Sequence, residues 1–255
     1  MWNWFHIRYF HPMHLQARTI AIAIIALTGA AIVALAGWRL LMPHSVHIDL
    51  DRSEYPVIGI DISSHNGRVD FRRARLEGGV RFVYLKATEG ADFRDKAFAA
   101  NFDSARAAGL DVGPYHFFRF DTEGAEQARN IISTLNGRII DLPVAIDVEE
   151  SGNPAQVPTE TIMERLQALR ATLAAAGIPS LIYTNKAGYS RFMRRRISDA
   201  DLWICSFTTP PISSAVSWRL WQHSHRATIP GIKGPVDLNT FNGDTLAYRT
   251  WLKAQ

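Results

Sequence analysis

PVAIDVEESGNP, residues 143–154, is a short apolar run that ends in three acidic residues. In a β-strand successive side chains point to opposite faces, so Val144 and Ile146 share one face while Asp147 and Glu149 share the other. Two carboxylates therefore lie close together where the sequence is otherwise most hydrophobic. Like charges in a poorly solvated place raise a carboxyl pKa, which lowers stability and suits an acid catalyst.

This segment is the fourth of eight short apolar runs that read as strands. Helical patterns at residues 95–110, 123–136 and 159–177 separate the early runs, and we expect Thr159 to cap the third helix and Gly177 to end it. Strands that alternate with helices predict a parallel sheet, which eight strands can close into a barrel. The eight runs are 57–61, 81–86, 111–117, 143–149, 180–184, 202–207, 218–222 and 235–238.

The alternation of strand and helix stops after the sixth run. A parallel crossover takes about a dozen residues and usually a helix. The segments FTTPPISSAVS (207–217) and HSHRATIPGIKGP (223–235) are instead rich in Pro, Gly and Ser and have no helical period. We therefore expect an irregular TIM-like α/β barrel of about five βα units followed by three strands joined by loops.

Acidic residues recur in other strands of this expected barrel. Asp61 closes the first run and Asp237 lies in the eighth, in addition to Asp147 and Glu149. Functional groups of such barrels gather on the rim at the carboxyl ends of the strands. Any one acid could be a helix cap or half of an ion pair, but four carboxylates on one rim suit glycoside hydrolysis. Glu150 points to the other face and is left out of this set.

Aromatic and polar residues near the same strand ends favour a sugar site, because aromatic rings pack on apolar faces while their polar edges form hydrogen bonds. Some aromatic residues, among them Phe117, Phe207 and Trp218, are expected in the core instead. The residues expected to bind substrate are Tyr115, His116, Tyr183, Trp203, Trp221, Gln222 and Glu89.

The N-terminal region predicts a transmembrane signal anchor at residues 19–42. The run from Ile20 to Trp38 is uncharged and mostly aliphatic, about the length that crosses a ~30 Å hydrocarbon core as a helix. Arg8 and Arg18 precede it without any acid, and such positive flanks stay in the cytoplasm.

This orientation makes residues 1–18 a cytoplasmic segment and exports everything after the span. Residues 43–56 are expected to be a linker and residues 57–255 one catalytic domain, membrane-anchored and periplasmic or extracytoplasmic. The alternative is a signal peptide cleaved near Ala36, which would make the protein secreted.

Composition bounds the remaining possibilities. The chain has 255 residues, 47% of them hydrophobic, which is typical of a globular protein with a sizeable core. Its single cysteine, Cys205, excludes an internal disulfide and is expected to be a buried small hydrophobe. The formal net charge is +4, but the first 42 residues hold three of the 28 basic residues and no acid, so the exported part is near +1. Nothing here favours nucleic acid as a partner, and the cluster around Arg191 and Arg194–Arg196 is expected to be a solvated helical face.

A series of motifs between Val57 and Phe241 resembles glycoside hydrolase family 25, the Chalaropsis-type lysozymes. The resemblance implies a β-1,4-N-acetylmuramidase acting on peptidoglycan glycan strands, on a barrel of five βα units plus three strands. It also implies that Glu149 is the proton donor and that Asp147, Asp61 and Asp237 line the same site. The motifs are GIDISSHNGRVDF, FVYLKATEGADFRDKAF, NFDSARAAGLDVGPYHFF, PVAIDVEE, LIYTN, LWICSF, WRLWQHS and GPVDLNTF.

Two motifs depart from the family pattern. Where the family often has Gln-Gly after the first aspartate, this chain has Asn66-Gly67 preceded by His65, and Cys205-Ser206-Phe207 stands where Ala-x-Tyr is frequent. Both departures affect expected sugar contacts, and neither removes a carboxylate. We expect a monomer without a cofactor or metal.

The stereochemical course stays open at this point. Residues i and i+2 of a strand lie ~6.6 Å apart along the chain. This distance falls between the ~5–5.5 Å carboxyl separation of retaining enzymes and the ~6.5–9.5 Å of inverting ones. A third course is attack by the 2-acetamido group of the substrate, oriented by Asp147, with Glu149 as acid and then base. This retaining, substrate-assisted course is our hypothesis.

Two other functions compete with the hydrolase. One is a catalytically inactive, membrane-tethered protein that binds cell-wall glycan on the same barrel, although binding alone needs no acid of raised pKa. The other is a metal-dependent deacetylase or hydrolase that uses His65, His116 or the pair His223 and His225. Metal sites need converging imidazoles, and the last two histidines are expected in a Pro/Gly-rich loop without a third partner.

Overall fold

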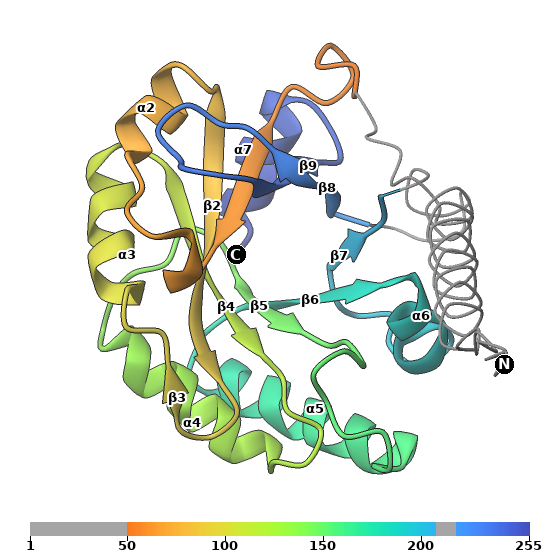
Figure 1. The fold of residues 1–255 in the computed structure, drawn as a ribbon. Helices are drawn as coiled ribbons and strands as arrows, with labels where there is room; N and C mark the ends of the chain where they lie inside the picture. The colour runs from red at the N-terminus through yellow and green to blue at the C-terminus, as the bar shows by residue number, and fades with distance from the viewer. Residues whose placement is uncertain (1–49, 208–217) are drawn as a thin grey trace, which may run out of the picture. The chain divides into compact units, whose positions relative to one another are not determined.

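The computed structural model describes residues 50–207 and 218–255, whose strands form one sheet that closes into a barrel (Figure 1). The expected cytoplasmic segment 1–18, the expected span 19–42 and part of the expected linker lie outside these described residues. Within them, no helix combines the length and the apolar character needed to cross a membrane.

The strands confirm all eight predicted runs, with shifted ends, and add one short hairpin strand. They are β1 (Ile58–Ile62), β2 (Val80–Glu89), β3 (Phe93–Arg94), β4 (Asp111–Phe117), β5 (Val144–Asp147), β6 (Ser180–Asn185), β7 (Leu202–Cys205), β8 (Leu220–Ala227) and β9 (Val236–Phe241).

The helices include the three predicted ones, α3, α4 and α5, and add α2, α6 and α7. They are α2 (Phe71–Leu76), α3 (Phe98–Ala107), α4 (Gly124–Leu135), α5 (Thr159–Ala175), α6 (Lys186–Gly188), which continues into a π-helical turn (Tyr189–Met193), and α7 (Thr245–Lys253). A 3₁₀ turn (Ser64–Asn66) follows β1. The helices α2 to α6 each follow a strand of the barrel, which confirms the five predicted βα units.

The barrel closes at β1, which pairs in parallel with β2 and antiparallel with β9. The strand order is β1-β9-β8-β7-β6-β5-β4-β2, with β3 attached to the outside of β2. The barrel strands β1, β2, β4, β5, β6, β7 and β8 are parallel, each to the next. Strand β9 lies between β8 and β1 and is antiparallel to both. The prediction of a parallel sheet is therefore wrong for β9, because the short connection at residues 228–235 leaves no room for a crossover and makes a hairpin instead.

The reversed direction of β9 determines where Asp237 lies. Asp237 is near the start of β9 and pairs in register with Asp61 near the end of β1. The start of β9 thus lies on the same rim as the ends of the parallel strands. Asp237 therefore lies on the predicted rim, but in a strand that runs opposite to the direction expected from its sequence.

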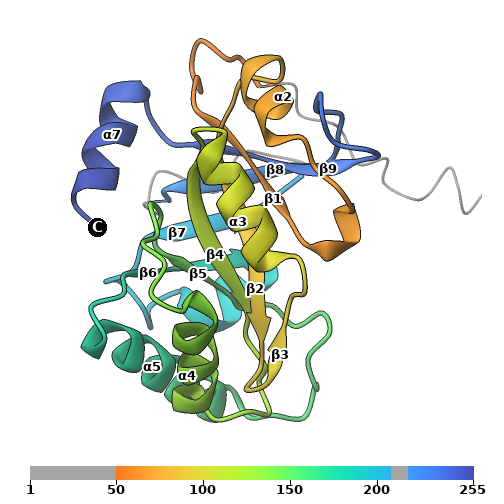
Figure 2. The same cartoon turned by 90° about the vertical axis from the view of Figure 1, so that its left-hand side faces the viewer.

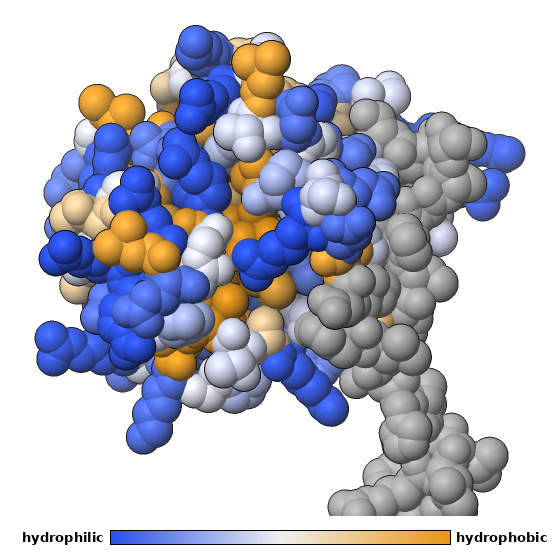
Figure 3. Space-filling view, turned by 90° about the horizontal axis from the view of Figure 1, so that it is seen from above, coloured by the Kyte–Doolittle hydropathy of each residue, from blue (hydrophilic) through white to orange (hydrophobic). Residues whose placement is uncertain are grey.

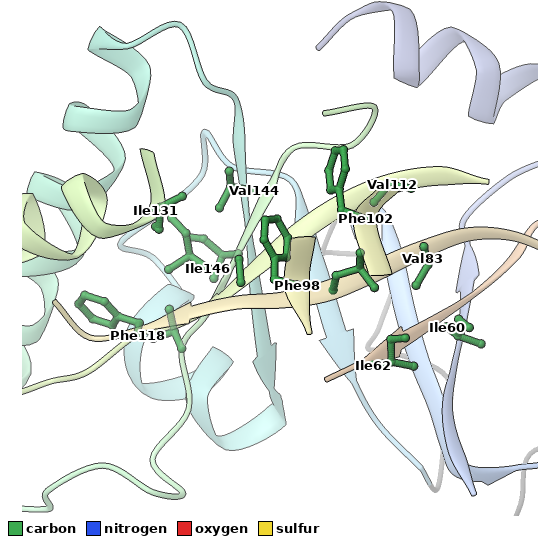
Figure 4. Close-up of a cluster of buried hydrophobic side chains, with 14 of the residues drawn as sticks. Ile60, Ile62, Val83, Phe98, Phe102, Val112, Phe118, Ile131, Val144 and Ile146 are labelled. Atoms are coloured by element: carbon green, nitrogen blue, oxygen red, sulfur yellow. The ribbon is translucent and has the colours of Figure 1, made fainter. Parts of the chain in front are cut away.

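The strands separate two layers of apolar side chains. Val144 and Ile146 belong to the outer cluster between strands and helices (Figure 4), as does Val148, whereas Ala145 belongs to the cluster inside the barrel. This is the alternation that the sequence of β5 predicts. Helices α2, α3 and α4 cover the same side of the barrel (Figure 2) and bury the outer cluster.

The interior of the barrel is filled mainly by aromatic residues. Tyr84 lies 4.7 Å from Trp203, between ring centroids, and Tyr183 meets the same indole edge to face at 4.8 Å. Such packing holds the Trp203 ring in one orientation. Seen from above (Figure 3), hydrophilic side chains cover most of the surface, and hydrophobic ones show between them.

Three local predictions differ from the structure. The N-cap of α5 is Pro158, and the hydroxyl of Thr159 accepts a hydrogen bond from Arg191 instead of capping the helix. His223 and His225 lie in β8 and not in a loop, because β9 extends the pairing of β8 as far as Ala227. Phe117, Phe207 and Trp218, which were expected in the core, are only half-buried.

The arginine cluster follows α6: Arg191 lies in the π-helical turn and Arg194–Arg196 in the turn after it. Arg191 pairs with Glu150, and Arg196 pairs with Glu160 at 3.7 Å. Glu150 is exposed and its carboxylate binds this arginine, consistent with its exclusion from the set of acids on the rim.

Gly124, the first residue of α4, is required for the contact between α4 and α5. A Cβ atom at this position would lie 1.8 Å from the carbonyl oxygen of Arg165. We expect Gly124→Ala to lower the free energy of unfolding by about 1–3 kcal/mol, since a methyl group forced into a packed contact shifts backbone. The matched control is Gly137→Ala, whose Cβ meets no atom within 4 Å although the backbone φ is +75°. Gly137→Ala therefore measures the cost of a Cβ at positive φ alone, about 1–2 kcal/mol, whereas an unchanged midpoint of Gly124→Ala in urea denaturation would show that crowding at Gly124 is unimportant.

Candidate active site

A pocket of about 190 Å³ opens at the carboxyl ends of the parallel strands. Its lining combines all four predicted acids with four of the seven residues expected to bind substrate. These eight residues come from β1, β4, β5, the residues after β5, β6, β7, β8 and β9, so the site forms only when the barrel closes. They are Asp61, Tyr115, Asp147, Glu149, Tyr183, Trp203, Gln222 and Asp237.

Asp147 and Glu149 come from the apolar segment 143–154. The strand ends at Asp147, two residues earlier than predicted. The chain nevertheless stays attached to β6, because the Val148 amide donates to the Tyr183 carbonyl at 2.9 Å and Thr184 Oγ1 donates to the Val148 carbonyl at 2.7 Å. Both carboxyl groups therefore reach the same pocket.

Burial is the main cause of the raised pKa values of Asp147 and Glu149. Asp147 is 9% exposed, and burial raises its pKa well above the usual value, with the charges of Glu149 and Asp61 adding to the effect and Lys86 opposing it. Burial also raises the pKa of Glu149, while a long hydrogen bond from Asn185 Nδ2, 3.4 Å, partly offsets the rise. The pair thus keeps a proton at a pH where isolated carboxyl groups are ionised.

Asp61 and Asp237 form a second pair. The Asp61 Oδ2 atom accepts hydrogen bonds from Gln222 Nε2 at 2.9 Å and from Asn239 Nδ2 at 2.7 Å. Burial, the Asp61 charge and a hydrogen bond with Asp61 raise the pKa of Asp237 to about 8. Burial also raises the pKa of Asp61, but its hydrogen bonds with Asn239, Gln222 and Asp237 oppose that rise.

The remaining lining residues are neutral. Burial raises the pKa values of Tyr115 and Tyr183 well above the usual value, and the nearby carboxylates raise them further. The Tyr183 hydroxyl donates to Gln222 Oε1 at 2.9 Å. Neutral hydroxyls beside an aromatic ring, Trp203, suit a ligand that carries hydroxyl groups on an apolar ring.

Three residues expected to bind substrate do not line this pocket. His116 is buried between Thr88 and Gln127, with its ring nitrogens 2.7 Å and 2.9 Å from their oxygens, and burial lowers its pKa to about 4. Trp221 points away from the barrel interior, as its neighbour Gln222 points in, and its indole donates to the Ser206 carbonyl.

Glu89 also lies outside the pocket lining. Its carboxylate is 2.9 Å from the Lys86 ammonium and 3.7 Å from the Arg119 guanidinium. Lys86 is in turn held over the rings of Phe93 and Phe117, with Nζ 5.3 Å and 5.5 Å from the ring centroids.

Two asparagines contact the acids and were not predicted. Asn239 is fully buried and bonds Asp61, and Asn185, the last residue of β6, bonds Glu149. The sequence does contain a signal for Asn239, since it stands two residues after Asp237 in one strand and therefore shares its face. Asn185 has no comparable signal, because strand ends are the least regular part of a pattern.

Cys205 is half-buried and not fully buried as expected. It pairs in register with Asn185 on one side and Gln222 on the other. Burial raises the pKa of its thiol to about 12, so the thiol is neutral near pH 7. Across residues 50–207 and 218–255, no group of three or more His, Cys, Asp or Glu side chains has the geometry of a metal site.

Comparison with known proteins bears on this arrangement. The model of glycosyl hydrolases family 25 matches residues 60–232. The protein YegX of Escherichia coli K12 is 32% identical over 213 residues, which is 81% of this chain and 76% of YegX. The autolytic lysozyme of Clostridium acetobutylicum is 32% identical over 184 residues, which is 72% of this chain and 55% of that lysozyme.

The solved structure of a family 25 glycosyl hydrolase from Bacillus anthracis has the same fold. It superposes with a TM-score of 0.73 at 30% identity and covers 80% of this chain and 96% of the other. The family match spans β1 to the end of β8 and so includes Asp61, Asp147 and Glu149. The chain therefore belongs to glycosyl hydrolases family 25, as its sequence motifs predicted, and is a glycoside hydrolase of the muramidase class.

Proposed function

We propose that this chain hydrolyses the β-1,4 bond between N-acetylmuramic acid and N-acetylglucosamine in peptidoglycan, with Glu149 as the proton donor. The observation that supports this most is the buried Asp147 and Glu149 pair in one pocket with Asp61 and Asp237. A carboxyl group that keeps its proton near neutral pH can protonate a leaving glycosidic oxygen. The Clostridium relative, itself named an autolytic lysozyme, supports the substrate class.

Asp147 fits the role of orienting the substrate acetamido group. Its Oδ1 atom is buried and has no hydrogen-bond partner among the described residues. An acetamido N–H would supply that partner, and burial makes such a bond strong. In contrast, Glu149 is more exposed, as a group that must meet the leaving oxygen and then water has to be.

The proposed reaction has two steps. First, the acetamido carbonyl oxygen attacks the anomeric carbon, the glycosidic C–O bond breaks, and Glu149 gives its proton to the leaving oxygen. Second, the Glu149 carboxylate takes a proton from water, which attacks the same carbon and releases the acetamido group. The product keeps the anomeric configuration of the substrate, so an inverted product in an NMR time course would overturn this course.

The cleaved bond can be tested by product analysis. The full chain in detergent is incubated with purified peptidoglycan, and the products are reduced with borohydride and analysed by mass spectrometry. We expect reduced N-acetylmuramic acid at the ends of the fragments. Reduced N-acetylglucosamine at the ends would refute the assigned bond, and the absence of any fragments would favour a protein that only binds glycan.

We also infer that residues 19–42 anchor the chain in a membrane, with the barrel exported and acting as a monomer. The uncharged length of this segment and the arginines before it support the anchor. Resistance of the protein to extraction from membranes at alkaline pH tests the anchor, and a chain lacking its first residues in the soluble fraction would indicate cleavage near Ala36 instead.

A further inference from the structure

The Asp61 and Asp237 carboxyl groups must share a proton. The two residues lie directly opposite each other on adjacent strands, and both line the same pocket. Two ionised carboxylates at this position repel each other and are acceptors only, so a proton on one of them relieves the repulsion and can join the pair by a hydrogen bond. The structure then raises the question of which carboxyl group carries it.

Trp203 fixes the orientation of the Asn239 amide. The Trp203 indole N–H can only donate, and it lies 2.9 Å from the Asn239 side chain. The atom that receives this bond must be the amide oxygen. The amide NH₂ of Asn239 therefore faces Asp61, to which it donates at 2.7 Å.

Gln222 approaches Asp61 from β8, the strand on the other side of β9 from β1. Its NH₂ donates to the same Asp61 oxygen, and its amide oxygen receives the Tyr183 hydroxyl. Asp61 thus accepts two N–H bonds, each of which stabilises its ionised form. No amide donates to the Asp237 carboxyl within the described part of the chain, and its one interacting neighbour there is Asp61.

We propose that Asn239 and Gln222 are positioning residues that direct the shared proton to Asp237 and leave Asp61 as the carboxylate. Asp237 then donates its hydrogen bond to Asp61 and presents a neutral group to the pocket. The catalytic role of this arrangement rests on the proposed function. In the proposed hydrolysis, Asp61 is a fixed negative charge near the anomeric carbon, where positive charge develops.

The charge of the pair also depends on the groups that face it. These groups are the carboxyls after β5, the phenols of β4 and β6 and the thiol of β7, whereas β8 and β9 contribute only the two amides. Lys86 of β2 acts on this set through Asp147. The facing titratable residues are Asp147, Glu149, Tyr115, Tyr183 and Cys205.

The test is a titration of the pair by ¹³C NMR, on the full chain in detergent micelles with labelled aspartate carboxyls. Signals are assigned with Asp61→Asn and Asp237→Asn. In the unsubstituted protein we expect Asp61 ionised and Asp237 protonated at pH 6, with Asp237 titrating at about 8. In Asn239→Leu we expect the midpoint of Asp61 to rise by about one to two pH units, the value of a lost hydrogen bond to a charged group.

Thr240→Val is the matched control. Thr240 is the next residue of β9, is equally buried, and donates its hydroxyl to the Val57 carbonyl away from the pocket. It should leave both midpoints unchanged although it removes a buried hydrogen bond; Asn239→Leu removes two, the one to Asp61 and the one from Trp203.

Two results would overturn the proposal: a protonated Asp61 at pH 6 in the unsubstituted protein, or an unmoved Asp61 midpoint in Asn239→Leu. The titration needs no substrate, so it is decided even if peptidoglycan is not cleaved. Where the enzyme is active, the acidic limb of kcat/KM should move to higher pH in Asn239→Leu and stay in place in Thr240→Val. A uniform loss of activity with an unmoved limb would indicate a purely structural role.

Discussion

Replacement of Glu149 by Gln is expected to lower the rate of peptidoglycan cleavage by about 10²–10⁴-fold, the usual contribution of a positioned general acid. The amide keeps the shape of the side chain and the contact with Asn185, but it has no acidic proton for the leaving oxygen. The measurement is the release of reducing ends from purified peptidoglycan. The loss should fall on kcat, since the variant can still bind glycan.

Glu150→Gln provides the control for this substitution. Glu150 is the adjacent residue of the same segment, is exposed, and pairs with Arg191 on the outside of the barrel. It is expected to keep full activity. If the Glu150 variant lost as much activity as the Glu149 variant, a distorted loop after β5 would explain both results, and the donor would have to be sought elsewhere.

Replacement of Asp147 by Asn is expected to lower kcat by about 10²–10³-fold, the effect of removing one group aimed at charge that develops in the transition state. When the single proton of the pair lies on Glu149, the Asp147 carboxylate stabilises positive charge on the acetamido group, which the neutral amide cannot do. Asp111→Asn is the control, because Asp111 is a half-buried carboxyl at the start of β4 that contacts Arg81 and Tyr248. Activity of the Asp147 variant near that of the unsubstituted protein would exclude the assisting role.

The same Asp147 variant is expected to be more stable than the unsubstituted protein at neutral pH. Burial holds the pKa of Asp147 well above its value in the unfolded chain, about 3.9. As the pH rises above about 4, the unfolded state loses this proton while the folded state retains it, so the unsubstituted protein loses stability over that range. Asparagine does not titrate, and thermal melts at pH 4 and pH 7 should show its gain mainly at pH 7. A lower melting temperature at pH 7 would contradict the cause given for the raised pKa.

The acids that line the pocket could be predicted because their positions follow from the strand period. Asp147 ends an apolar strand, and Asp61 ends another, so both were expected on one rim. Substrate-binding residues were expected from their nearness to a strand end, without regard to the face on which each side chain lies. Trp221 and Gln222 are adjacent in β8 and cannot both point inward, and only Gln222 lines the pocket. His116 failed for the same reason, as it alternates with Tyr115, which does line the pocket.

Other parts of the site depend on contacts between distant strands. Asn239 gains its role only when β9 pairs with β1 and brings its amide to Asp61, which is 178 residues earlier in the chain. Asn185 contacts Glu149 only because β5 and β6 are neighbours. No local pattern encodes such partners, since they are set by which strands pair and in what register.

The sequence by itself determined the five βα units, the identity of the four acids and the family, because period, turn residues and ordered motifs are local properties of the chain. Only the tertiary structure decided the antiparallel direction of β9, the closure of the barrel at β1, and the pairing of Asp61 with Asp237. In PVAIDVEESGNP the alternation of faces is written in the residues. The raised pKa values of Asp147 and Glu149 are not, because burial exists only once the strands and helices around them have packed.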